Sequence, residues 1–168
     1  MVTYAVGNRV VNYVKTIGHR GKPTGRQPVD IARGKGDLIY SLARGYEYTP
    51  GEKGVGVCTV NEDYVTQFGG GGTGDGKFVW PTSIAIDKDE NVYVADEDLQ
   101  RISIFSKDGE FLSKWGEAGD SDGQIDRPSG LAFDSEDNLF VVDSANSRIQ
   151  KFTKDGKFLA KWGQFGSG

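Results

Sequence analysis

Short apolar runs separated by polar turns recur along most of this chain. The clearest unit, residues 81–116, contains four such runs, at 83–86, 92–95, 102–106 and 111–115. The first two are almost continuously apolar, which is typical of strands covered on both faces by neighbouring sheets. The last carries Ser113 and Lys114, as expected of an edge strand that faces solvent. The pattern predicts an all-β fold of antiparallel strands, and no segment shows a helical period.

Asp, Asn and Gly supply the turns within each unit. Asp-Lys-Asp-Glu-Asn follows the first run and Lys-Asp-Gly-Glu follows the third. These residue types tolerate the left-handed backbone that tight turns require. Each unit is therefore predicted to be four strands joined by short hairpins.

The unit recurs with a period of 47 residues, and each copy ends in an aromatic residue and a glycine, at positions 68–69, 115–116 and 162–163. Seventeen of the 36 positions in residues 81–116 are identical to those in 128–163. An earlier and more diverged copy covers residues 28–69. A fixed period of this size indicates an array of supersecondary units. Four strands per unit predict the blades of a β-propeller.

The repeat divides the chain into one partial propeller domain, residues 1–168. We expect blade 1 at residues 26–69, blade 2 at 78–116 and blade 3 at 125–163. Residues 1–18 have two apolar runs around a Gly-Asn-Arg turn, which predicts the third and outer strands of a partial blade. The chain thus holds about three and a half blades.

The last two copies resemble the NHL repeat, whose usual form is a six-bladed propeller. The resemblance rests on Arg-Pro-Ser-Gly-Leu-Ala-Phe-Asp, on Asn-Leu-Phe-Val-Val-Asp-Ser-Ala-Asn-Ser-Arg-Ile-Gln-Lys-Phe, and on the outer strand ending at Trp162-Gly163. The first copy departs from it, with Leu42 where the repeat Asp is expected and a long loop at 43–54. The resemblance implies a six-bladed ring on completion, which needs about two and a half further blades.

An open array of blades exposes an apolar sheet face at each end. We therefore expect either a homodimer through the terminal blade faces or a separate chain that supplies the missing blades. Residues 1–57 carry a net charge of +5 and residues 58–168 one of -9. This asymmetry would steer a head-to-tail association, although loops of different charge explain it without any association.

The composition indicates a turn-rich protein with no disulfide. It has 25 glycines and one cysteine, Cys58, which lies in an apolar third strand and is expected to be a buried, inert thiol. No signal peptide or apolar run of membrane-spanning length is visible. A cytoplasmic location without membrane contact is the expectation.

The long loop of the first copy is the strongest candidate binding site. It supplies residue types that are favoured at binding hot spots and lies where ligands usually dock on a propeller. A loop packed over blade 1 explains the insertion equally well. The candidate ligand-binding residues are Arg44, Tyr46, Glu47, Tyr48, Arg20, Asp96 and Asp143.

Asp96 and Asp143 each precede an arginine by five residues, at Arg101 and Arg148. Because the pair recurs in successive blades, we favour structural support of the intervening loop over catalysis.

Asp120, Asp122 and Asp126 resemble a calcium loop but lack the glutamate at position 12 and the flanking helices of an EF-hand. We therefore expect a turn and no metal. His19 is the only histidine, and the glycine-rich segment 69–76 lacks the ending of a phosphate loop. No cofactor is expected.

We favour a non-catalytic binding or assembly module that presents the loops of one propeller face to a ligand. The alternative is half of a hydrolase or lyase with a site in the axial channel, lined by Arg20, Arg44, Asp96 and Asp143. The acidic second and third blades argue against nucleic acid as a partner, while the basic first third argues for it.

Overall fold

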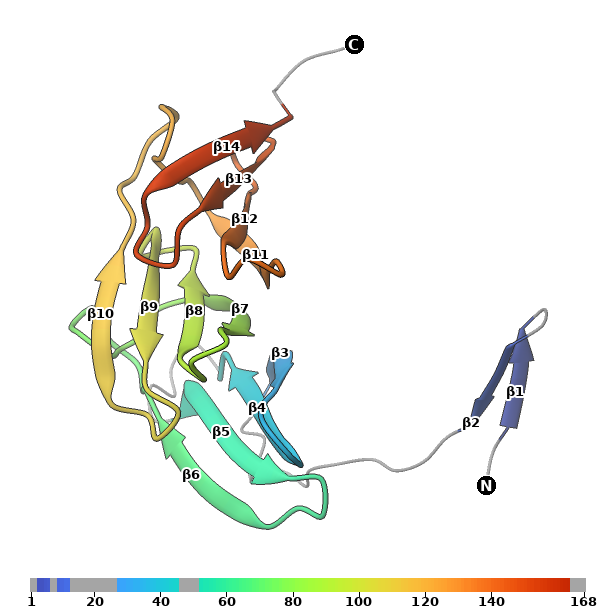
Figure 1. Ribbon diagram of the computed structural model, residues 1–168. Helices are drawn as coiled ribbons and strands as arrows, with labels where there is room; N and C mark the ends of the chain where they lie inside the picture. The colour runs from blue at the N-terminus through green and yellow to red at the C-terminus, as the bar shows by residue number, and fades with distance from the viewer. Residues whose placement is uncertain (1–2, 7–8, 13–26, 46–51, 164–168) are drawn as a thin grey trace.

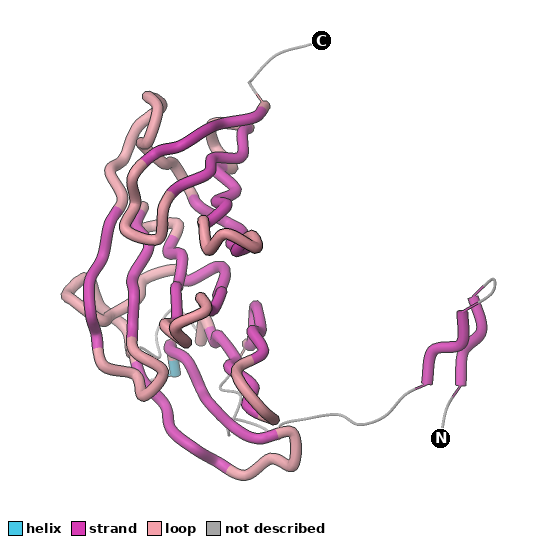
Figure 2. The backbone as a smooth tube through the Cα atoms, in the orientation of Figure 1, coloured by secondary structure: helices cyan, strands magenta, loops and turns pink. Residues whose placement is uncertain are grey.

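The computed structural model describes residues 3–6, 9–12, 27–45 and 52–163. Three four-stranded antiparallel sheets form the body of the protein, each in the order of the sequence. They stand side by side along an arc, with β3, β7 and β11 on its inner side and β6 and β10 on its outer side (Figure 1). The described residues contain no α-helix, and their loops lie at the ends of the strands (Figure 2). The predicted propeller blades are confirmed.

Each sheet is one blade, and its strands run from the inner to the outer edge. Blade 1 consists of β3 (Pro28–Arg33), β4 (Leu38–Ala43), β5 (Gly54–Thr59) and β6 (Tyr64–Phe68). Blade 2 consists of β7 (Pro81–Ile86), β8 (Val92–Asp96), β9 (Arg101–Phe105) and β10 (Phe111–Trp115). Blade 3 consists of β11 (Pro128–Phe133), β12 (Leu139–Asp143), β13 (Arg148–Phe152) and β14 (Phe158–Trp162).

A separate two-stranded sheet forms near the N-terminus. Strand β1 (Thr3–Val6) pairs antiparallel with β2 (Arg9–Asn12). The hairpin agrees with the two apolar runs read from the sequence. Residues 13–18 lie outside the described residues, so the partial blade stays a prediction.

A β-bulge lies near the start of each inner strand. The register shifts after Pro28, Pro81 and Pro128, and proline at the first position of a strand leaves no ladder donor unsatisfied. Ser83 lies directly after the bulge in β7. Its hydroxyl donates to Asp30 Oδ2 at 2.6 Å and accepts from Leu131 N at 3.1 Å. A single buried serine thus connects all three blades.

The same register corrects one prediction about blade 1. Pro81 pairs with Asp96 and Pro128 pairs with Asp143, whereas Pro28 pairs with Ala43. Ala43, not Leu42, therefore occupies the position of the repeat aspartate. The error of one residue arose because the diverged first copy offers few identities on which to align it.

Two apolar cores lie between the blades. The first brings Leu42, Val55 and Val57 of blade 1 against Val92 and Val94 of blade 2, all of them almost fully buried. The second packs the opposite face of blade 2 against blade 3, with Ala95, Ile102, Leu139, Val141 and Phe152 at its centre. Blade 2 is thus buried on both faces, which explains its nearly continuous apolar runs in the sequence.

Cys58 in β5 is fully buried, as predicted. Burial raises the pKa of its thiol, and the nearby carboxylate of Glu62 adds to this effect. No helix in the described ranges is both long enough and apolar enough to cross a membrane.

Candidate functional site

Four of the predicted ligand-binding residues lie outside the described residues. They are Arg20, Tyr46, Glu47 and Tyr48. The structure places the other three, Arg44, Asp96 and Asp143, at the end of the blades where the connections between second and third strands lie.

Arg44 and Lys53 flank the long loop of blade 1 and both contact Trp80, which leads into blade 2. The Arg44 guanidinium carbon lies 4.6 Å from the centroid of the Trp80 ring, and Lys53 Nζ lies 5.5 Å from it. Arg44 Nε donates to Pro81 O at 3.3 Å, and Lys53 Nζ donates to Val79 O at 2.6 Å. Cation–π and hydrogen-bond contacts therefore anchor both ends of the loop across the junction of blades 1 and 2.

Asp96 lies in the interior, with no exposed surface. Its carboxylate accepts hydrogen bonds from four backbone N–H groups, of Val79, Trp80, Asp98 and Leu99, at 2.7 to 3.2 Å. Four such donors replace the hydrogen bonds to water that the carboxylate loses on burial. Asp96 thus binds the backbone of the segment that leads into β7 and of the turn after β8. Its oxygens do not face a ligand.

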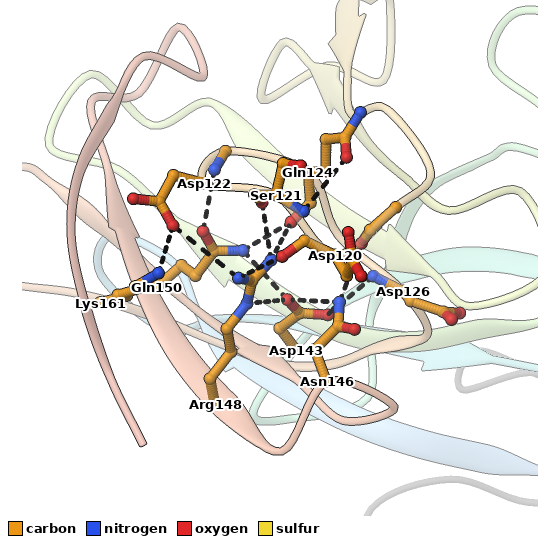
Figure 3. Close-up of polar contacts among 12 residues, drawn as sticks. Asp120, Ser121, Asp122, Gln124, Asp126, Asp143, Asn146, Arg148, Gln150 and Lys161 are labelled. Carbon is orange, nitrogen blue, oxygen red and sulfur yellow. Dashed lines mark hydrogen bonds and ion pairs between the residues drawn. The ribbon is translucent and has the colours of Figure 1, made fainter. Parts of the chain in front are cut away.

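Asp143 is the equivalent residue of blade 3 and is equally buried. Its oxygens accept from Asp126 N at 2.7 Å, from both the Asn146 and Gln150 amides at about 3.0 Å, and from Arg148 Nε at 2.6 Å. Figure 3 shows these side chains converging on one carboxylate. Asp143 and Arg148 therefore form a buried ion pair within a network of amide donors.

The two Nη groups of Arg148 bind the loop that contains Asp120, Asp122 and Asp126. Nη1 donates to Asp120 O at 2.7 Å, and Nη2 donates to Ser121 O and Gln124 O, each at 2.8 Å (Figure 3). A calcium ion would need such carbonyl oxygens as ligands. The arginine occupies them, so the loop is organised by a side-chain cation.

The three carboxylates of that loop do not converge. Asp122 binds Lys161 of β14, while Asp126 accepts from Gln100 Nε2 at 3.2 Å. Asp120 contributes its backbone carbonyl to Arg148. The Asp122 and Asp126 side chains thus have separate partners, in β14 and in the turn before β9.

In blade 2, the equivalent arginine binds the equivalent loop with its two Nη groups. Arg101 Nη1 donates to Thr73 O, and Nη2 donates to Gly74 O and Lys77 O. Its Nε and the Ser103 hydroxyl are buried and find no hydrogen-bond partner among the residues that the structure describes. Among the described residues, blade 3 has a direct aspartate–arginine ion pair and blade 2 does not.

Gln150 stands in blade 3 where blade 2 has Ser103. Its amide donates to Gln124 O at 2.6 Å and to Asp143, and it accepts from Gly123 N at 3.0 Å. Sequence reasoning missed Gln150 because the position is not shared by the two repeats.

A second acidic cluster lies at the opposite end of blades 2 and 3. Carboxylate oxygens of Asp87, Asp89 and Asp137 lie within 4.8 Å of one another. Lys154 Nζ binds Asp89 and lies 3.5 Å from Asp137, and its bond to Asp89 raises the pKa of this lysine. One ammonium group thus offsets part of the negative charge of the cluster. These residues come from two blades, which is why spacing in the sequence did not reveal them.

The face of blade 3 that points away from blade 2 carries exposed apolar side chains. Val142 lies opposite Ile149, and Ile149 lies opposite Trp162, so the three share this face. They are 38%, 41% and 50% exposed, and Phe140 stacks on Trp162 with centroids 5.5 Å apart. We call this surface the end face. It consists of Gly130, Ala132, Phe140, Val142, Ile149, Lys151, Ala160 and Trp162.

Two segments of the chain match known repeats. Residues 126–152, which include β11, β12 and the Asp143–Arg148 pair, match the NHL repeat. Residues 63–95, which join blades 1 and 2, match a β-propeller repeat. The chain thus contains propeller-type repeats, one of which matches the NHL repeat. No protein of curated function matches it.

Solved structures share the propeller-like fold of these blades at low sequence identity. A protein of unknown function from Bacteroides caccae has 19% identity and a TM-score of 0.54, with 83% of this chain and 47% of that chain covered. The virginiamycin B lyase from Staphylococcus aureus has 15% identity and a TM-score of 0.59, with coverage of 84% and 42%. The hydrazine synthase of Kuenenia stuttgartiensis has 14% identity and a TM-score of 0.59, with 89% of this chain and 39% of that chain covered. The chain spans less than half the length of each of them.

Proposed function

We propose that this chain is a non-catalytic assembly and binding module whose end face receives another propeller blade. The observation that supports this is the contrast between equivalent positions in successive blades. Ala95 and Ile102 of blade 2 are fully buried against blade 3. Their equivalents one repeat later, Val142 and Ile149, are 38% and 41% exposed. The same face that forms a core between blades is open at blade 3.

Docking of a blade would remove several apolar side chains from water. Complete burial of a valine or isoleucine is worth about 1.5–3 kcal/mol, so half-exposed Val142 and Ile149 would each contribute about 1 kcal/mol. Trp162 adds a larger apolar surface, because it is 50% exposed. A large exposed apolar patch of this kind marks an interaction surface.

A six-bladed ring, completed by a second copy or by a separate chain, is the assembly that we propose. On this ring the Arg44 loop would face a ligand at the mouth of the central channel. The contacts of Arg44 and Lys53 with Trp80 support this role, because they fix the two ends of the loop at a blade junction. Rigidly anchored loops on a stable scaffold commonly carry binding sites.

An enzymatic role built on Asp96 and Asp143 is less well supported. Both carboxylates are enclosed and bind backbone or side-chain donors, so neither is available to a substrate in the channel. The lyase among the similar structures shares the fold alone, and fold does not determine activity. Turnover of ester substrates by the purified protein would favour this alternative.

The mass of the protein in solution tests the proposal. Sedimentation velocity over a range of concentrations should reveal self-association, because the exposed end face will contact another copy when no better partner is present. Ile149→Asp should weaken that association by placing a charge on the end face. Lys157→Asp, on an exposed turn of blade 3, is the matched control. A monomer of about 18.2 kDa at every concentration would refute completion of the ring by a second copy.

A further inference from the structure

An aromatic ring rests on a glycine at both blade junctions. Phe68 of β6 lies against Gly109, in the hairpin between β9 and β10. Trp115 of β10 lies against Gly156, in the equivalent hairpin of blade 3, where an added Cβ would lie 2.6 Å from the indole ring. A side chain at either glycine would collide with the ring. The aromatic-Gly and Lys-Asp-Gly motifs of the repeat are therefore two halves of one contact.

A phenylalanine beneath the ring completes each of these junctions. The centroid of Phe68 lies 5.0 Å from that of Phe105, and the centroid of Trp115 lies 4.9 Å from that of Phe152. Trp115 Nε1 also donates to Lys154 O at 3.2 Å. The receiving blade thus presents a phenylalanine at the end of its third strand and a glycine in the hairpin that follows.

Blade 1 lacks both receiving residues. Cys58 pairs with Tyr64 as Phe105 pairs with Phe111, so Cys58 takes the place of the phenylalanine. The turn bond from Glu62 N to Thr59 O, at 3.0 Å, corresponds to the bond that closes the turn at the glycine of blade 2. Glu62 even keeps the positive φ of a glycine, at 73°. Glutamate therefore stands where the other two blades require glycine.

Trp162 is the third member of the aromatic series and lies on the open end face. It stacks on Phe140 of its own blade, 50% exposed. In a head-to-tail homodimer, its ring would meet the Cβ of Glu62 and the small Cys58 side chain. Cys58 is moreover already fully buried in the single chain. The receiving side of blade 1 does not match the end face.

We propose that the end face is built for a blade with phenylalanine and glycine at these positions, as in blades 2 and 3, and not for blade 1 of a second copy. This inference rests on the proposed function and names the partner of the same surface. Lys151 lies on the end face where blade 2 has Ile104, and its ammonium pairs with Asp134 at 2.8 Å. A docked blade would therefore cover a neutralised ion pair and not a lone charge.

Glu62→Gly tests the inference in the full chain, because it gives blade 1 the missing glycine. We expect this variant to self-associate about tenfold more tightly than wild type in sedimentation velocity, since one aromatic contact is gained. Asn61→Gly adds a glycine one position earlier in the same turn and should leave the association unchanged. Adding Trp162→Ala to Glu62→Gly should abolish the gain.

The outcomes separate this inference from the proposed function. If wild type associates through the end face but Glu62→Gly gives no gain, blade 1 of a second copy already fits and the inference is wrong. A gain that persists without Trp162 would also overturn it. If neither wild type nor Glu62→Gly associates, the added glycine gives Trp162 no contact, so the inference is wrong and completion of the ring by a second copy fails with it.

Discussion

Replacing Arg148 by methionine removes the guanidinium that organises blade 3 while keeping a side chain of similar length. In the native protein the arginine side chain is 6% exposed. It donates to Asp143 at 2.6 Å, to Asp120 O at 2.7 Å, and to Ser121 O and Gln124 O at 2.8 Å. The substitution breaks all four bonds and places no new polar group in the interior.

The expected loss in the free energy of unfolding depends on the buried groups that lose Arg148 as a partner. Asp143 keeps its amide donors but loses the Arg148 cation. The carbonyl oxygens of Asp120 and Ser121 lose this donor, while Gln124 O keeps the Gln150 amide. Breaking a buried ion pair by removing one partner typically costs about 3–5 kcal/mol. This is a large share of a total stability of about 5–15 kcal/mol. For a chain of this size the melting temperature should fall by about 6–20 °C.

Urea denaturation followed by circular dichroism measures this loss directly. Lys157→Met, on the exposed turn of blade 3, is the matched control and should change the unfolding free energy by less than about 0.5 kcal/mol. Arg101→Met in blade 2 should cost less than Arg148→Met, because Arg101 Nε is buried with no partner in the described part of the chain. An Arg148→Met protein within about 1 kcal/mol of wild type would refute this account of the loop.

Three further predictions concern single positions. Gly156→Ala should cost about 2 kcal/mol or more, because φ is +86° and the new Cβ would meet Trp115, whereas Gly36→Ala, at φ +67° in open space, should cost only about 1 kcal/mol. The hydrogen bond from Lys151 holds the pKa of the Asp134 carboxyl below its ordinary value of 3.8. The contribution of Asp134 to the free energy of unfolding should therefore be complete above pH 3.8 and disappear as the pH falls further. Asp134→Asn should therefore flatten the acid limb of the stability curve. Cys58 should react with a thiol reagent only when the protein unfolds, because its thiol is buried and its pKa is raised.

Each of these has a result that would contradict it. Equal losses at Gly156 and Gly36 would show that the contact with Trp115 carries no energy. An unchanged acid limb in Asp134→Asn would mean that other carboxylates determine the acid sensitivity. Rapid modification of Cys58 in the folded protein, at a rate independent of urea, would show that the thiol is accessible.

The period of the repeat, with its alternation of apolar runs and turn residues, determined the fold of blades 2 and 3. The predicted first and third strands, 83–86 and 102–106, lie within two residues of β7 and β9. This success has a physical basis, because a strand buried on both faces must be apolar throughout and a tight turn requires Gly, Asn or Asp. Alignment of the diverged first copy was off by one residue, since sequence identity there was too low to define the register.

The roles of the polar residues were decided by contacts between blades. Asp143 and Arg148 were singled out by their recurrence, yet nothing in their spacing indicated that the guanidinium would fill the loop at 120–124. Gln150 escaped notice because blade 2 has a serine there. The cluster of Asp87, Asp89 and Asp137 joins residues of two blades. Such contacts depend on how one sheet stacks on the next.

The sequence alone thus determined the unit of the fold, its number of strands and the positions of its turns, because these depend on local pattern within one repeat. Only the tertiary structure revealed why the repeat ends in an aromatic residue and glycine. The ring of one blade and the glycine of the next lie about 40 residues apart and meet only when the sheets stack. The same stacking shows that Glu62 occupies a position where its neighbours need glycine, a mismatch that has meaning only across an interface.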